Sequence, residues 1–135
     1  MENKKEIVIT SAFRTAIGSF GGSLSSLSAA QLGAEVIKKC VEHSELKNTD
    51  VDTVYMGQVL QAGTGQNPAR QAAIKAGIPN TKPAHLINQV CGSGLRSIIS
   101  GFQQIILNDA NIVVSGGQEN MSRSHHSLFF RIDKK

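Results

Sequence analysis

In the segment INQVCGSGLRSII, residues 87–99, an apolar run ends, a small-residue turn follows and a helical pattern begins. The stretch AHLINQV that leads into it predicts a strand over residues 84–90. Apolar residues then recur at helical spacing, which predicts a helix over residues 93–107. Cys91 therefore lies in a strand-to-helix turn, and the two glycines that follow it permit a tight turn.

In both directions from this segment, the chain repeats the alternation of strand and helix. A capping-box pattern begins a helix at Ser28, with Gln31 three residues later. Asn67 and Pro68 are residue types that begin a helix, and Gly77 ends that helix. The order β-α-β-α-β-α-β predicts an α/β fold with a mostly parallel sheet and helices on both faces. The remaining strands are predicted over residues 6–13, 51–61 and 111–117.

Composition narrows the class of protein. The 135 residues suit one domain, and 18% charged with 40% hydrophobic residues is typical of a globular chain. The net charge is +4, and four lysines at the chain ends account for it, so the interior is nearly balanced in charge. Because only 4% of the residues are aromatic and no basic cluster is present, we expect no nucleic-acid surface. The apolar run after MENKK is too short for a signal sequence or a membrane span. We therefore expect a cytoplasmic protein without a disulfide framework.

Cys91 is the candidate reactive residue. It precedes the N-terminus of a predicted helix, where free N–H groups and the helix dipole stabilise an anion such as a thiolate. Active sites of open α/β sheets lie at this carboxyl end of the strands. The residues alone leave two interpretations open, a cysteine nucleophile and a buried structural cysteine. Cys40, on the apolar face of the helix that begins after Ser28, is expected in the core.

Other motifs of binding or reactive sites do not fit. Ser97 stands where a dinucleotide-binding fingerprint needs glycine or alanine, and Leu95 breaks the serine nucleophile-elbow pattern around Ser93. Cys40, Cys91 and the histidines lack metal-ligand spacing, so we expect no metal site. No base for the cysteine is evident among the four histidines, His43, His85, His125 and His126.

The helix predicted after Cys91 has two distinct faces. One face carries the small residues Ser97, Ser100 and Gly101, which permit close approach of another backbone. Two interpretations stay open: a helix covered by its own sheet on one side and by a further layer on the other, or an ordinary amphipathic helix with a polar outer face. The apolar stripe consists of Leu95, Ile98, Ile99, Phe102, Ile105 and Ile106.

Four stretches resemble the sequence motifs of a known family: RTAIGSFGGSL (14–24), GQVLQAGTGQNPARQAA (57–73), NQVCGSGLRSI (88–98) and SGGQENMS (115–122). By these stretches, their order and their spacing, the chain resembles the thiolases, in the acetyl-CoA acetyltransferase branch. The resemblance implies that residues 1–122 form the thiolase N-terminal domain, which is half of an α-β-α-β-α arrangement. It also implies that residues 123–135 begin the loop region and end as a truncated tail.

The same resemblance implies that Cys91 is the acyl-thioester nucleophile and that its backbone N–H contributes to an oxyanion hole. Asn88 and Gln89 are implied to be positioning residues. The family reaction condenses two acetyl-CoA to acetoacetyl-CoA, or runs the reverse thiolysis. Acetyl-CoA and CoA are thus the implied substrates, with no tightly bound cofactor. The CoA-binding residues of this chain stay unassigned.

The chain departs from the thiolases in its length. The activating histidine, the second cysteine and most of the CoA-binding surface of the family lie in segments that these 135 residues lack. We therefore expect the chain to be inactive alone, with the C-terminal thiolase half as its missing partner. The full-length form is expected to be a homo-oligomer, a dimer or tetramer. The alternative is a non-catalytic truncated remnant or a dimerisation module.

Overall fold

A three-stranded parallel sheet organises the protein, and the computed structural model describes residues 5–127. The strands are β1 (Thr53–Gly57), β2 (Ala84–Ile87) and β3 (Val113–Gly117), in the order β2-β1-β3. Gly57 is in register with Ile87 on one side and with Gly117 on the other. The carboxyl ends of the three strands therefore meet at one edge of the sheet.

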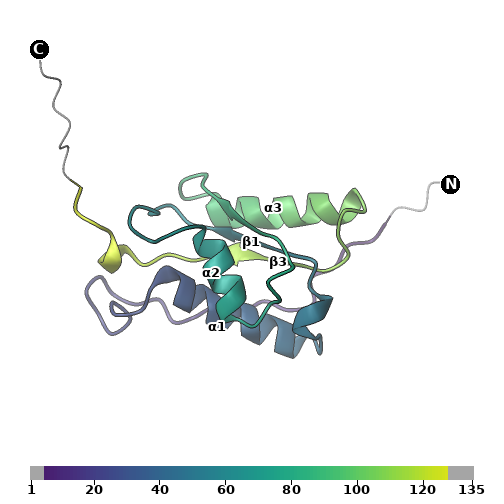
Figure 1. Cartoon of the computed structure of the whole chain (residues 1–135), viewed down its shortest axis with the longest axis horizontal. Coiled ribbons are helices and arrows are strands. Elements are labelled where there is room, and N and C mark those ends of the chain that lie inside the picture. Colours follow the sequence, from purple (N-terminus) through teal and green to yellow (C-terminus); the bar gives the residue numbers. More distant parts are fainter. Residues whose placement is uncertain (1–4, 128–135) are drawn as a thin grey trace, which may run out of the picture.

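Three α-helices cover the two faces of this sheet (Figure 1). α3 (Ser93–Ile106) lies on one face, and α1 (Ala29–His43) and α2 (Pro68–Lys75) lie on the other. Two 3-10 turns, η1 (Asn48–Asp50) and η2 (Met121–Arg123), also form. The predicted α/β class, the parallel sheet and the helices on both faces are confirmed, although the strands are shorter than predicted.

The helices begin where local sequence predicts. Ser28 Oγ accepts a 3.1 Å hydrogen bond from the N–H of Gln31, and the Gln31 side chain accepts one of 2.8 Å from the N–H of Ser28. Asn67 caps α2 by accepting a 3.0 Å hydrogen bond from the N–H of Arg70, with Pro68 at the start of the helix. These bonds satisfy N–H groups that have no partner inside the helix, which fixes each starting point.

The core lies between the sheet and the pair formed by α1 and α2. Every residue of β1 is buried, as expected for the central strand of a parallel sheet. α2 contributes mainly alanines, which let it pack closely. The buried apolar cluster comprises Ala30, Ala34, Ile37, Val41, Val51, Val54, Met56, Ala69, Ala72, Ala73, Ala76 and Ile78.

The prediction of a strand over residues 6–13 is wrong. The segment forms no strand in the described structure, and Val8 and Ile9 are 66% and 80% exposed. A side chain anchors it instead, because Ser11 Oγ donates a 3.0 Å hydrogen bond to the carbonyl of Cys40. A β-branched run forms a strand only where the edge of another strand lies within hydrogen-bond reach. Here a cavity lies between the end of this segment and β3, so that edge is out of reach.

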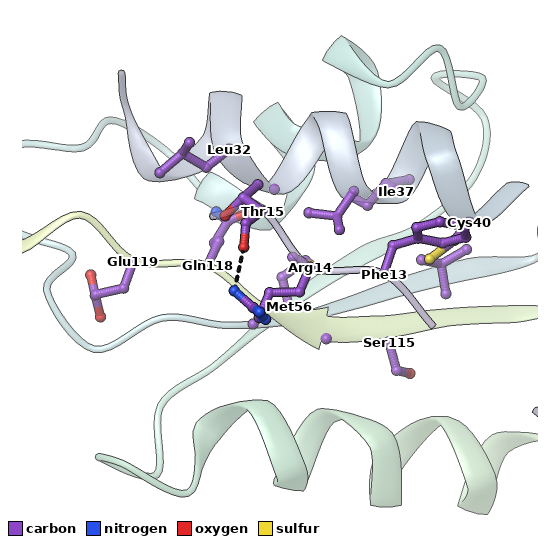
Figure 2. Close-up of a pocket in the computed structure, with 15 residues that line it drawn as sticks. Phe13, Arg14, Thr15, Leu32, Ile37, Cys40, Met56, Ser115, Gln118 and Glu119 are labelled. Carbon is purple, nitrogen blue, oxygen red and sulfur yellow. Dashed lines mark hydrogen bonds between the residues drawn. The ribbon is translucent and has the colours of Figure 1, made fainter. Parts of the chain in front are cut away.

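Figure 2 shows this cavity, where the segment of residues 13–15 lies between α1 and β3. Its volume is about 200 Å³. Cys40 is half-buried and lines the cavity, whereas Ile37 and Val41 belong to the buried cluster. The expectation that Cys40 lies in the core is therefore wrong, because the face of α1 that packs inward is narrower than its apolar stripe.

The chain after β3 folds back onto the loop before α1. Asn120 Nδ2 donates to the carbonyls of Leu24 and Leu27, at 2.9 and 2.6 Å. Of the tail predicted over residues 123–135, the structure describes residues 123–127, and the rest lies outside the described residues. The carboxyl end of the sheet and the loops around it are thus tied together before the tail begins.

Candidate active site

Cys91 lies in the turn between β2 and α3, at the carboxyl end of the sheet. Its side chain is exposed and forms no disulfide, so the interpretation as a buried structural cysteine is wrong. Open α/β folds bind and transform ligands at this end of their parallel strands. The position and exposure of the thiol therefore suit a nucleophile.

Ser93 holds the turn around Cys91. Its side chain is buried, and its Oγ donates a 2.6 Å hydrogen bond to the carbonyl of Val90 and accepts one of 2.8 Å from the N–H of Gln89. The N–H of Gly92 donates to the carbonyl of Gln89 at 3.0 Å. A buried hydroxyl thus supplies partners to backbone groups that have left the strand, and it fixes the chain on both sides of the cysteine.

Val90, directly before Cys91, has a strained backbone. Its φ is +51°, in the left-handed region that β-branched residues rarely adopt. Such a conformation costs roughly 1–3 kcal/mol and persists only where surrounding contacts enforce it, typically at functional sites. The enforcing contacts are the bond from Ser93 and a 3.1 Å hydrogen bond from the N–H of Val90 to Asn88 Oδ1. The strained residue, Val90, is therefore directly followed by the residue that carries the exposed thiol, Cys91.

α3 begins two residues after Cys91, with Gly92 as an N-cap that has no side-chain bond. Among residues 5–127, no hydrogen bond has the Cys91 N–H as its donor. The start of this 14-residue helix offers free N–H groups and the positive end of the helix dipole. An acyl oxygen that gains negative charge beside the thiol can be stabilised by such groups.

The histidines make contacts away from Cys91. His43 lies edge-on to Phe13, with 5.2 Å between the ring centroids, and His85 stacks on Tyr55 at 4.6 Å. His85 is held there by the pairing of β1 with β2, which places it opposite Tyr55. Within the described part of the chain no hydrogen bond joins a histidine to the cysteine. The turn alone thus supplies an exposed thiol and N–H donors but no proton acceptor.

α3 packs on the sheet through its small residues. Ser97 Oγ donates to the carbonyl of Gly116, and a Cβ added at Gly101 would lie 2.4 Å from Ser115 Oγ. The apolar stripe therefore faces away from the sheet, and the interpretation of α3 as a helix with a polar outer face is wrong. The exposed members of the stripe are Leu95, Ile98, Ile99, Phe102 and Ile106.

A carboxylate that follows β3 holds the loop that follows β1. Glu119 Oε2 accepts hydrogen bonds from the N–H groups of Val59 and Leu60, at 2.8 and 3.3 Å. Asn88 Nδ2 donates to the carbonyl of Val59 at 3.2 Å. This loop thus connects the end of β3 with the turn of Cys91, which Asn88 begins.

Sequence reasoning finds Cys91 and Asn88 but misses three residues of this arrangement. A hydroxyl two positions after the cysteine, in a turn of small residues, is a signal that could have indicated Ser93. The positive φ of Val90 has no sequence signal, because valine disfavours it. Glu119 contacts residues 59 and 60 positions away, and no local pattern encodes such a contact.

The rest of the described structure adds no metal site or membrane-spanning helix. Within residues 5–127, no three His, Cys, Asp or Glu side chains gather as metal ligands, and no helix there is long and apolar enough to cross a membrane. A second cavity of about 200 Å³ lies beside the start of α1 and includes Glu119 and His125 in its lining. Cys91 lines neither of the two cavities described.

Known proteins match both the sequence and the fold. The sequence-family model of the thiolase N-terminal domain matches residues 7–133. The acetyl-CoA acetyltransferase of Cupriavidus necator is 57% identical over 123 residues, which are 91% of this chain and 31% of that protein. The probable acetyl-CoA acetyltransferase of Escherichia coli is 52% identical over 124 residues, 92% of this chain and 32% of that protein.

A solved structure agrees with this match. A thiolase from Ascaris suum, crystallised in complex with coenzyme A, superposes with a TM-score of 0.86 at 39% identity, over 88% of this chain and 31% of that one. The chain therefore spans about a third of the length of these relatives. The matched region includes all three strands and the Cys91 turn. The chain belongs to the thiolase family, and the domain it contains is the N-terminal one.

Proposed function

We propose that this chain is the nucleophile-bearing N-terminal part of an acetyl-CoA C-acetyltransferase, with Cys91 as the acyl-accepting residue. The observation that carries the proposal is the exposed thiol on a strained turn, directly before an uncapped helix N-terminus. The Cupriavidus relative is named for this activity. The Ascaris thiolase, crystallised with coenzyme A, supports acyl-CoA as the substrate class.

The proposed reaction proceeds through an acyl-cysteine. The Cys91 thiolate attacks the carbonyl of acetyl-CoA, a new C–S bond forms, the bond to the CoA sulfur breaks, and CoA leaves as a thiolate. A base then removes a proton from the methyl group of a second acetyl-CoA, and the carbanion attacks the acetyl-cysteine. Acetoacetyl-CoA and the free cysteine result, and thiolysis is the reverse sequence. The covalent intermediate divides one difficult step into two easier ones.

The residues of this chain have separate parts in that sequence. The Cys91 N–H and the start of α3 stabilise the oxyanion that forms when the acyl carbonyl is attacked. Asn88, Gln89 and Ser93 hold the turn. The base for the second half-reaction, and most of the CoA-binding surface, come from a C-terminal half. A polypeptide of residues 1–135 alone is therefore proposed to be inactive in condensation, with no tightly bound cofactor.

The exposed stripe of α3 gives the C-terminal half a place to pack. Ile98 and Phe102 are 45% and 49% exposed on the outer face of α3. Covering them makes α3 an inner layer of the α-β-α-β-α arrangement, and the whole protein associates as a dimer or tetramer. On this division residues 1–122 form the domain and residues 123–135 begin the loop region. Two free cysteines suit the reducing cytoplasm.

A second candidate function is a non-catalytic association module, and the same stripe favours it. Contiguous exposed apolar side chains mark sites of protein association. A second copy of the chain could bury the stripe without any chemistry at Cys91. The two candidates differ in what happens at the thiol, so an activity measurement separates them.

The test joins this chain to the C-terminal half of the Cupriavidus relative and measures acetoacetyl-CoA formation. We expect activity in the joined protein, its loss in Cys91→Ser and its retention in Cys40→Ser. A folded joined protein that is inactive, or that stays active without the Cys91 thiol, contradicts the proposal. Condensation by residues 1–135 alone, if abolished by Cys91→Ser, contradicts the need for a second half.

A further inference from the structure

The peptide group between Val59 and Leu60 is held from both sides. Its N–H donates to Glu119 Oε2 at 3.3 Å, and its C=O accepts from Asn88 Nδ2 at 3.2 Å. The preceding N–H, that of Val59, donates to the same carboxylate oxygen at 2.8 Å. Bonds of a carboxylate to backbone N–H groups are charge-assisted and stronger than neutral ones. The position of this peptide is therefore set by Glu119.

Asn88 connects this peptide to the turn of Cys91 by hydrogen bonds. Its Nδ2 donates to the peptide held by Glu119, and its Oδ1 accepts from the N–H of Val90, the residue directly before the cysteine. Asn88 is itself exposed, so packing does not fix its side chain. Its orientation depends on these two hydrogen bonds, one at each end of the amide. Displacing the loop would free Asn88 and, with it, a contact that enforces the strained backbone of Val90.

The second oxygen of Glu119 has no partner of its own in the described part of the chain, as is also true of the buried oxygens Ser115 Oγ and Gln118 Oε1. Oε1 is buried and has no hydrogen-bond partner within the described residues. Neither of the two ion pairs found there includes Glu119. An unpaired buried acceptor costs roughly 1–3 kcal/mol, so Glu119 holds the loop through Oε2 while Oε1 contributes nothing to stability.

Asp52 provides the same arrangement at the other end of the sheet. Its Oδ2 accepts from the N–H groups of Asn111 and Ile112, at 2.8 and 3.2 Å. Asp52 precedes β1 and ties the start of β3, whereas Glu119 follows β3 and ties the loop after β1. The two carboxylates thus perform the same task in the sheet, but only one is connected to Cys91. Asp52 is therefore a matched control for Glu119.

We propose that Glu119 is a positioning residue for Cys91, acting through the Val59–Leu60 peptide and Asn88 to hold the turn that presents the thiol. The inference rests on the proposed function, in which Cys91 accepts the acyl group. Glu119 itself touches no reacting atom in this account. Its effect is mechanical: it limits the number of conformations that the turn can adopt before acyl transfer.

The test uses this chain joined to the C-terminal half of the Cupriavidus relative, with Cys40→Ser so that Cys91 is the only thiol of residues 1–135. Glu119→Ala, Glu119→Gln, Asp52→Ala and Asn88→Ala are compared in this background. Three quantities are measured: the rate of acetyl transfer from acetyl-CoA to Cys91 by the mass of the Cys91 peptide, the exchange rate of the Val90 amide hydrogen, and the urea midpoint. The urea midpoint reports stability, which both carboxylates are expected to support.

Glu119→Ala is expected to slow acetyl transfer about tenfold and to speed exchange of the Val90 amide. Asp52→Ala should lower the urea midpoint but leave both turn measurements nearly unchanged. Glu119→Gln should restore most of the rate, because its amide oxygen still accepts from Val59 and Leu60. Combining Glu119→Ala with Asn88→Ala should add nothing to Asn88→Ala, because both changes break one connection.

Equal effects of Glu119→Ala and Asp52→Ala on the turn would overturn the inference, and so would additive effects of Glu119→Ala and Asn88→Ala. The proposed function fails separately: if the joined protein with an intact Glu119 takes no acetyl group at Cys91, Cys91 is not the acyl acceptor. The exchange rate of the Val90 amide still decides, in that case, whether Glu119 positions the turn.

Discussion

Ser93 Oγ and the carbonyl oxygen of Val90 are joined by a 2.6 Å hydrogen bond, which holds a β-branched residue at a φ of +51°. The same hydroxyl accepts from the N–H of Gln89, so one buried side chain contacts the turn at two points. Because Val90 directly precedes Cys91, the bond acts on the segment that carries the thiol. A backbone held in this way can keep a nucleophile in place before substrate arrives.

Ser93→Ala removes both of these hydrogen bonds. We expect it to lower the free energy of unfolding by about 1–3 kcal/mol, because the N–H of Gln89 loses its partner. It should also slow acylation of Cys91, because the turn is no longer fixed. Urea unfolding and intact mass after exposure to acetyl-CoA measure the two effects. Ser100→Ala is the matched control, since Ser100 lies on the same helix and makes no side-chain hydrogen bond among residues 5–127.

Val90→Gly should not destabilise the protein, although it removes a large side chain. Glycine adopts a positive φ freely, which relieves about 1–2 kcal/mol of strain. The greater entropy of the unfolded chain offsets about 0.5–1 kcal/mol of that gain. Val8→Gly is the control, because Val8 is also 66% exposed but has no positive φ. A larger loss of stability in Val90→Gly than in Val8→Gly would contradict the assignment of strain.

Gly101→Ala tests the close packing of α3 on the sheet. The new Cβ would lie 2.4 Å from Ser115 Oγ and 3.0 Å from Val113 Cγ1, so either the helix or these two side chains must shift. We expect a loss of about 1–3 kcal/mol in the free energy of unfolding, despite the better helix propensity of alanine. Gly94→Ala in the same helix meets nothing closer than 3.8 Å and should be tolerated. Similar stabilities of the two variants would show that α3 does not pack as described.

Asp52 should make stability depend on pH in the acid range. Hydrogen bonds from the N–H groups of Asn111 and Ile112 lower the pKa of its carboxyl, with a smaller contribution from Lys82. The stabilisation is therefore complete above the unfolded pKa of about 3.9 and is lost as the pH falls through the lower pKa of the folded state. As the pH is lowered from about 5, the free energy of unfolding of Asp52→Asn should fall less than that of the unaltered chain. Urea titrations at a series of pH values measure this difference. Parallel curves for the two proteins would exclude this role.

Features encoded by neighbouring residues could be predicted from the sequence. The bonds between Ser28 and Gln31, and from Arg70 to Asn67, involve residues three positions apart, so a short pattern specifies them. The placement of Cys91 between a strand and a helix is local in the same sense. These features position the candidate nucleophile correctly without knowledge of the rest of the fold.

The remaining features depend on parts of the chain far apart in sequence. Val8 and Ile9 have strand-like side chains, but a strand also needs a partner edge, which the sequence pattern cannot supply. Which face of α1 turns inward depends on α2 and the sheet, so the half-buried position of Cys40 was not predictable. The connection from Glu119 to the turn spans loops brought together only by strand order.

The role of Cys91 as the acyl acceptor is tested by comparing the two cysteines of one molecule. This chain, joined to the C-terminal half of the Cupriavidus relative, is incubated with acetyl-CoA, quenched in acid and digested, and the acetyl content of the Cys91 and Cys40 peptides is followed over time. Cys40, half-buried beside a cavity, is the internal reference. We expect Cys91 to be acetylated well before Cys40. No acetyl group on Cys91, or equal rates at the two cysteines, would contradict the assignment of Cys91 as the acyl-accepting nucleophile.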